Sequence, residues 1–324
     1  MIMNNNAALD EIRRVLLEND DFVITAHVNP DSDAVGSCLA LGLSLKKLGK
    51  RVNVILDAFH SKNLIIPGQG LIWEGAAAAP DVSALITLDC ANAERVYDPF
   101  ALMKLAPVTI CIDHHLSHDP FARYIYLDPD ASSTCELIYR IVSAMVEFDA
   151  DIGSAIYAGL LTDTGGFRHR CVSSETLRVA SELIKLNIPF TDIYNELLKK
   201  HSPVETYVMR AALNNLELLQ NGRAALSFIS SEDMTDIGAT ASDTDGISEY
   251  LLNIRDVEAA VFLYEKSKGE VKASIRSLTI NVSETAKAFG GGGHKRAAGC
   301  IIRSPLAEAC GAMSRAIISA IETA

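Results

Sequence analysis

The feature that most constrains the fold is an alternation of short apolar runs with amphipathic stretches from Asp21 onward. The runs FVITA, VNVIL, ALITL, VTICI and YIYL are rich in branched residues and are followed by polar or turn residues. Such runs are typical of buried strands in a parallel sheet, and the stretch 34–49 has the pattern of a crossover helix. The sequence therefore predicts an α/β fold built on an N-terminal parallel sheet.

A second pattern begins at Gly222, after a polar helical stretch over 191–220. Its strands are predicted at 224–229, 258–264 and 272–276, followed by a glycine-rich loop, AFGGGGHKRAAGC. The length of 324 residues also exceeds the usual size of one hydrophobic core. We predict a first domain over 1–190, a helical linker over 191–220, and a smaller α/β domain over 221–324.

The formal net charge of −12 argues against a protein that binds long duplex nucleic acid by neutralising many phosphates. Residues 221–324 carry 11 basic and 13 acidic side chains, so most of the negative charge lies before them. An acidic N-terminal part suits a cation site, and a nearly balanced C-terminal part can hold a small anion. Seven scattered cysteines form no CxxC pair and are expected to be free thiols.

The N-terminus lacks the basic start and apolar stretch of a signal peptide. No apolar segment approaches the roughly 20 residues that a spanning helix needs. We therefore expect a cytoplasmic protein with no membrane partner.

Three apolar runs end directly in clusters of acidic residues and histidines: AHVNPDSD after the first run, DCAN after the third, and DHH after the fourth. In open α/β sheets, ligands bind outside the carboxyl ends of strands, so these clusters are expected to converge. Together with Asp163 in LLTDTGGF, they supply enough histidines and aspartates for two adjacent cations with one shared carboxylate. Nitrogen and oxygen ligands of this kind suit Mn²⁺ or Mg²⁺. Taken alone, the first cluster is equally compatible with a helix N-cap.

The ordered motifs HVNPDSDA, LDCAN, DHH, TDTGG and GGGGHKRAAG resemble the DHH phosphoesterase superfamily with its DHH-associated C-terminal domain. The resemblance covers the chain from about Asp21 to its end. Its length and GGGGH element are similar to the nanoRNase/pAp phosphatase group. That group hydrolyses short oligoribonucleotides to 5′-mononucleotides and dephosphorylates 3′-phosphoadenosine 5′-phosphate (pAp).

The resemblance implies two divalent cations, preferably Mn²⁺ with Mg²⁺ as the alternative, and a hydroxide activated between them. The implied ligands are His27 and Asp31 for one cation, Asp33, His114 and Asp163 for the other, and Asp89 for both. His115 is expected to face the phosphate as a catalytic residue. Asp113 is expected to support catalysis by orienting the loop and the ligating histidine.

The predicted substrate residues lie in the C-terminal domain. Glycines let backbone N–H groups approach a phosphate, and an arginine beside a strand can aim its guanidinium at one. The residues that match the family are Arg255, Arg276, Gly291, Gly292, Gly293 and His294. Without the resemblance, a flexible surface loop is the favoured explanation of the glycine run, and many arginines in such positions are merely solvated or salt-bridged.

The alternatives are a linear or cyclic dinucleotide phosphodiesterase, a manganese-type inorganic pyrophosphatase, and a nucleotide-binding regulator without catalysis. The sequence does not distinguish short single-stranded RNA from pAp or pGpG as the preferred substrate. It also leaves the direction of trimming, the physiological metal and a homodimer open.

Overall fold

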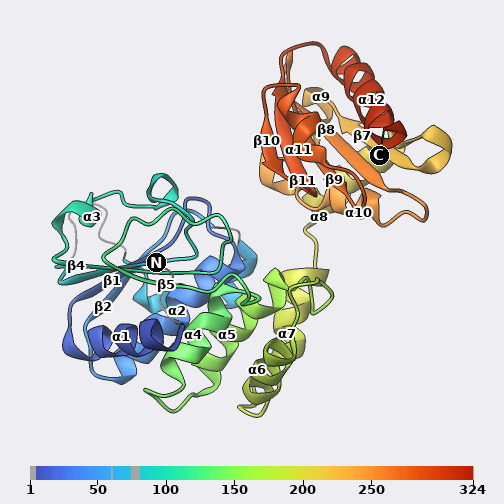
Figure 1. Cartoon of the computed structure of the whole chain (residues 1–324). Helices are drawn as coiled ribbons and strands as arrows, with labels where there is room; N and C mark the ends of the chain where they lie inside the picture. The colour runs from blue at the N-terminus through green and yellow to red at the C-terminus, as the bar shows by residue number, and fades with distance from the viewer. Residues whose placement is uncertain (1–4, 60, 74–80, 324) are drawn as a thin grey trace. The chain divides into compact units, whose positions relative to one another are not determined.

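The computed structural model describes residues 5–59, 61–73 and 81–323, and the chain divides into two compact units. The first unit ends at Lys200 and the second begins at His201. Figure 1 shows the helices and strands of each unit.

The first unit contains a parallel sheet of five strands within the described residues, in the order β2-β1-β3-β4-β5. The strands are β1 (Phe22–Thr25), β2 (Val52–Ile55), β3 (Ala84–Leu88), β4 (Val108–Asp113) and β5 (Tyr124–Leu127). The predicted α/β fold with an N-terminal parallel sheet is confirmed. Because the strands are parallel, their carboxyl ends share one edge, where the polar clusters begin.

Helices cover one face of this sheet. The helices α1 (Asn5–Glu18), α2 (Ser32–Lys47) and α4 (Thr134–Val142) contact its strands. The helices α5 (Ala150–Asp163), α6 (Ser174–Ile184) and α7 (Phe190–Tyr194) pack against other helices of this unit. Figure 1 shows α1, α2, α4 and α5 on the same side of the strands. Phe22 and Ile24 pack into this large core, whereas Val23 packs into a smaller one on the opposite face with Leu102 of α3 (Leu102–Leu105). Both faces are therefore buried, which explains the continuous apolar runs.

The second unit contains a mixed sheet of six strands among the described residues, in the order β10-β11-β9-β8-β7-β6. The strands are β6 (Glu217–Leu219), β7 (Ala224–Ile229), β8 (Ala259–Ser267), β9 (Glu270–Ser277), β10 (Gly292–His294) and β11 (Ala297–Ile302). Its helices are α8 (Pro203–Asn214), α9 (Ser231–Ile237), α10 (Ile247–Leu252), α11 (Val282–Lys287) and α12 (Leu306–Glu322). One core packs α11 and α12 against the sheet, and the other packs α8 to α10 against the opposite face.

The glycine-rich segment differs from the prediction, which assigned it to a loop. Gly292–His294 pairs as β10 with the antiparallel strand β11. Strands are recognised in a sequence by alternating or continuous apolar residues with large side chains. Because this hairpin consists mostly of glycine and alanine, its sequence only weakly indicates strands. The stretch 191–220, predicted as a linker, contributes α7 to the first unit and α8 to the second. Across the described ranges, no helix has the length and apolar character needed to span a membrane.

Candidate metal and substrate sites

The predicted metal ligands converge at the carboxyl edge of the first unit's sheet. His27 and Asp31 follow β1, Asp89 follows β3, and His114 follows β4. Asp33 lies in the first turn of α2, and Asp163 is the last residue of α5. Three groups of side chains have ligand atoms within 4.8 Å of one another: His27, Asp31 and Asp89; Asp33, His114 and Asp163; and Asp89, His114 and His115. The structure thus brings all six predicted ligands together, while metal binding by each stays a prediction.

Asp89 lies at the centre of the cluster. Its Oδ2 is 3.6 Å from Nε2 of His27, and its Oδ1 is 3.6 Å from Nε2 of His114. Thr134 Oγ1 donates a hydrogen bond of 3.0 Å to the same Oδ1. The backbone of Asp89 is left-handed, with φ of 55°, a conformation that aspartate tolerates better than most residues. This sharp turn directly after β3 aims the carboxylate between the two groups of ligands.

The two histidines of the cluster are oriented through their other ring nitrogen. His27 Nδ1 donates to the Val28 carbonyl at 2.8 Å, and His114 Nδ1 lies 3.4 Å from the Ala131 carbonyl. Such contacts hold the tautomer that leaves Nε2 free as a ligand. His114 Nε2 is 3.2 Å from Oδ2 of Asp163.

Asp31 and Asp33 belong to one helix start but have different environments. Oδ1 of Asp31 accepts hydrogen bonds from the backbone N–H groups of Asp33 and Ala34 and so caps the N-terminus of α2. Asp31 is thus both the helix cap and a member of the cluster. Asp33 is fully buried, and its carboxylate accepts from the N–H groups of Thr134 and Cys135. The start of α4 therefore holds this carboxylate in place.

The carboxylates of the cluster lie close enough together to repel one another. Desolvation, together with repulsion from Asp89 and Asp163, raises the pKa of Asp31 to about 6. Desolvation and repulsion from the same two carboxylates raise the pKa of Asp33 well above its usual value. Although desolvation opposes it, hydrogen bonding to Asp163 raises the pKa of His114 to about 10. Divalent cations would relieve this repulsion, so the donor set fits the metals that the sequence predicts.

Asp113 accepts hydrogen bonds from two histidines, His115 and His118. The sequence predicted no role for His118. Oδ1 of Asp113 accepts from Nδ1 of His115 at 2.7 Å, and Oδ2 accepts from Nδ1 of His118 at 2.8 Å. Burial alone would raise the pKa of Asp113, but hydrogen bonds from His115 and His118 lower it to about 2. The hydrogen bond that His115 donates to Asp113 also raises the pKa of His115. Because Nδ1 of His115 is engaged, Nε2 is the atom left to exchange a proton.

Two supporting residues were missed by the sequence interpretation. The His118 side chain is only 1% exposed, and its Nε2 has no hydrogen-bond partner in the described part of the chain. Gly159 of α5 faces the cluster, because a Cβ built there would lie 2.5 Å from Oδ1 of Asp33 and 2.3 Å from Sγ of Cys135. Nothing in the sequence signals these roles, since they arise from a loop conformation and from the packing of α2 on α5.

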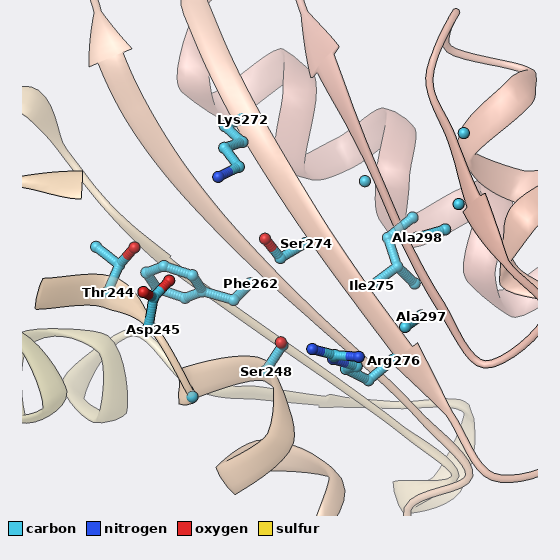
Figure 2. Close-up of a pocket in the computed structure, with 14 residues that line it drawn as sticks. Thr244, Asp245, Ser248, Phe262, Lys272, Ser274, Ile275, Arg276, Ala297 and Ala298 are labelled. Atoms are coloured by element: carbon cyan, nitrogen blue, oxygen red, sulfur yellow. The ribbon is translucent and has the colours of Figure 1, made fainter. Parts of the chain in front are cut away.

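The second unit has a pocket of about 330 Å³ on the face of its sheet that carries α10. Figure 2 shows Lys272 and Arg276 on β9 with Ser274 between them, and Thr244 and Asp245 on the facing wall. Of the predicted substrate residues, Arg276, Gly292 and Gly293 line this pocket. A neighbouring pocket of about 820 Å³ is lined by Gly291, Gly292, Lys272 and others.

The remaining predicted residues lie apart from the pocket lining. Arg255 is exposed in the turn between α10 and β8 and lines neither pocket. His294 pairs with Ala297, which pairs in turn with Arg276, so it belongs to the row of residues beside the pocket.

The three predicted glycines differ in what they provide. A Cβ on Gly291 would lie 2.2 Å from the Gly299 carbonyl oxygen, and one on Gly293 would lie 2.6 Å from the Ala297 carbonyl oxygen. These two glycines therefore allow β10 to approach β11. A Cβ on Gly292 would meet no atom within 4 Å, so this glycine leaves open space in the pocket.

Comparison with known proteins agrees with this architecture. Residues 21–162 match the DHH family, N-terminal domain, and residues 221–323 match the DHHA1 domain. The bifunctional oligoribonuclease and PAP phosphatase NrnA of Thermus thermophilus is 29% identical over 282 residues, covering 86% of this chain and 83% of that protein. The Bacillus subtilis protein of the same name is 29% identical over 313 residues, covering 91% and 93%.

A solved structure is similar over nearly the whole chain. The crystal structure of an exopolyphosphatase-related protein from Bacteroides fragilis has a TM-score of 0.89 and 28% sequence identity, and covers 98% of both chains. With its two matched domains, the present chain belongs to the DHH family and carries a DHHA1 domain. It is a metal-dependent phosphoesterase of that family.

Proposed function

We propose that the chain hydrolyses short oligoribonucleotides to 5′-mononucleotides and removes the 3′-phosphate of pAp. The observation that carries the proposal is the convergence of six predicted metal ligands, Asp89 among them, beside the His115–Asp113 pair. The similarity to relatives named as oligoribonucleases and PAP phosphatases supports this choice among phosphoester substrates.

The cluster supplies two ligand groups with one shared carboxylate, which suits two cations of the Mn²⁺ or Mg²⁺ type. His27 and Asp31 would hold one cation, Asp33, His114 and Asp163 the other, and Asp89 both. When bound, such cations neutralise charge on the phosphoryl group and make water a stronger nucleophile. Mn²⁺ is our first choice because two of the six ligands are histidines, whereas Mg²⁺ prefers oxygen alone.

His115 and Asp113 would handle the proton that the leaving oxygen requires. Asp113 holds the imidazole through Nδ1, and its negative charge keeps a proton on the ring at higher pH than usual. Nε2 of His115 can then donate to the departing ribose oxygen or stabilise charge on the phosphoryl oxygens. His118 holds the second carboxylate oxygen of Asp113 and so restricts its rotation.

The charges of the chain support short substrates rather than long ones. The cluster of four aspartates repels a polyanion wherever cations do not cover it, and the net charge of −12 adds to that repulsion. We propose that the DHHA1 unit provides the substrate-binding residues, with Arg276 as the main phosphate contact.

The test is hydrolysis by the purified chain with Mn²⁺ of labelled dinucleotide RNA, longer RNA, pAp, pGpG and pyrophosphate. We expect cleavage of the dinucleotide and of pAp, and loss of both activities in Asp89→Ala. Asp236→Ala removes an exposed aspartate of α9 and serves as the matched control. Cleavage of pyrophosphate alone, or activity that survives in Asp89→Ala, would refute the proposal.

A further inference from the structure

A row of four residues crosses the sheet beneath the 330 Å³ pocket. Phe262 of β8 pairs with Ser274 of β9, Ser274 pairs with Gly299 of β11, and Gly299 pairs with Gly292 of β10. Cross-strand partners share one face of a sheet, and all four residues line the pocket. We call this row the shelf. Because three of its members have small side chains or none, the sheet surface is hollowed there.

A cationic side chain stands on each side of the shelf. Lys272 lies two residues before Ser274 on β9 and Arg276 lies two residues after it, and both line the pocket. Four residues of strand separate their Cα atoms by about 13 Å. Neither side chain has an ion-pair partner among the described residues, although Lys272 lies 5.8 Å from the centre of the Tyr264 ring. Figure 2 shows the two side chains at opposite ends of the pocket.

The facing wall has the opposite character. Thr244, Asp245 and Ser248 line it, so it offers a carboxylate and two hydroxyl groups. A phosphoryl group beside Asp245 would be repelled, whereas ribose hydroxyls and base amino groups can donate to its oxygens. The pocket therefore has two ends that attract anions and a middle that accepts hydrogen bonds.

We propose that the shelf binds one nucleoside unit with a phosphoryl group at each end, and that Lys272 contacts a terminal phosphate that is not cleaved. Lys272 is thus a specificity-determining residue that favours 5′-phosphorylated dinucleotides and nucleoside bisphosphates over unphosphorylated dinucleotides. The inference rests on the proposed function, because it names the substrate feature that the same enzyme selects.

The first test is binding without catalysis, measured by calorimetry on the full chain in EDTA. The ligands are adenosine 3′,5′-bisphosphate and adenosine 3′- and 5′-monophosphate. We expect the bisphosphate to bind at least about tenfold more tightly than either monophosphate, as one charged hydrogen bond allows. Lys272→Met should abolish the preference over adenosine 3′-monophosphate, which lacks the 5′-phosphate that Lys272 would contact. The control Lys268→Met removes an exposed lysine near the β8–β9 turn that lines neither pocket, and should preserve the preference.

The second test is kinetic and uses Mn²⁺ with a dinucleotide that carries or lacks a 5′-phosphate. Lys272→Met should raise KM for the phosphorylated dinucleotide about tenfold, and so remove the difference in kcat/KM between the phosphorylated and unphosphorylated substrates. Equal affinity of the wild type for mono- and bisphosphates, absence of binding, or equal weakening of all three ligands in Lys272→Met would overturn the inference. Absence of hydrolysis of every substrate would instead refute the proposed function, because the EDTA measurement does not depend on it.

Discussion

The acidic edge of the first unit and the shelf of the second differ in how they are made. At the edge, polar side chains follow strand ends, and Asp89 lies close to side chains that follow β1 and β4. At the shelf, the site lies on the middle of a sheet face, and the absence of side chains at Gly292 and Gly299 creates the space. In the proposed function, the first region would supply the reactive groups, and the second would supply room and charge for the substrate.

Because the two regions differ in this way, mutations in them should have different effects. Changes at the edge should abolish chemistry and metal binding, whereas changes at the shelf should alter which substrate is used.

Asp89→Asn should reduce kcat on the order of 10³- to 10⁴-fold, because it removes the charge shared by both groups of ligands. Steady-state hydrolysis of a dinucleotide in Mn²⁺ measures the effect. Asp236→Asn should leave the rate within twofold of the wild type, and a similar loss in both variants would mean that Asp89 has no special role.

His115→Gln should lower kcat about 10²- to 10⁴-fold with little change in KM, because glutamine cannot deliver a proton from the position of Nε2. His201→Gln is the control, since His201 is exposed at the start of the second unit. A change in KM alone would assign His115 to substrate binding. It would contradict the assignment of catalysis to the first unit's acidic edge and of substrate selection to the shelf.

Gly159→Ala should weaken Mn²⁺ binding about 10- to 100-fold, because the new Cβ displaces the carboxylate of Asp33. Gly153→Ala on the same helix meets the end of the flexible Leu186 side chain and should bind Mn²⁺ normally. Both changes favour the helix equally, so isothermal titration separates the local effect from helix propensity. Equal Mn²⁺ affinities of the two variants would show that the Asp33 carboxylate can move to accommodate the new Cβ without weakening metal binding.

The sequence predicted the strands of the first unit because parallel strands buried on both faces are continuously apolar. It also predicted that the DHH cluster meets Asp89, since parallel topology brings strand ends together. It could not predict Gly159 or His118, whose roles depend on helix packing and on a loop that returns to Asp113. The hairpin of β10 and β11 was missed because its residues are mostly glycine and alanine.

Gly292→Val should reduce kcat/KM roughly tenfold by filling the shelf, while the melting temperature stays unchanged because the side chain enters open space. Gly291→Ala should instead lower the melting temperature, since its Cβ meets the backbone of β11. Thermal unfolding and dinucleotide kinetics on both variants distinguish the two glycines. Equal destabilisation by both changes would assign Gly292 to strand pairing as well.

The stability of the metal-free chain should fall as the pH rises from about 4 to 6, because the pKa of Asp31 is raised to about 6. It should continue to fall toward pH 10, where His114 loses its proton. The low pKa of Asp113 does not counter this trend, since its stabilising effect is complete above about pH 4. Because Mn²⁺ competes with protons for these ligands, the stabilisation by Mn²⁺ should grow with pH. Melting curves in EDTA and in Mn²⁺ measure both trends, and parallel curves would contradict the account.

The most direct test of the central claim is the number of Mn²⁺ ions that the chain binds, measured by electron paramagnetic resonance titration. The account predicts two ions per wild-type chain with the magnetic coupling of neighbouring sites, and loss of that coupling in Asp89→Asn. Binding of a single ion by the wild type, or an unchanged coupled pair in Asp89→Asn, would contradict it.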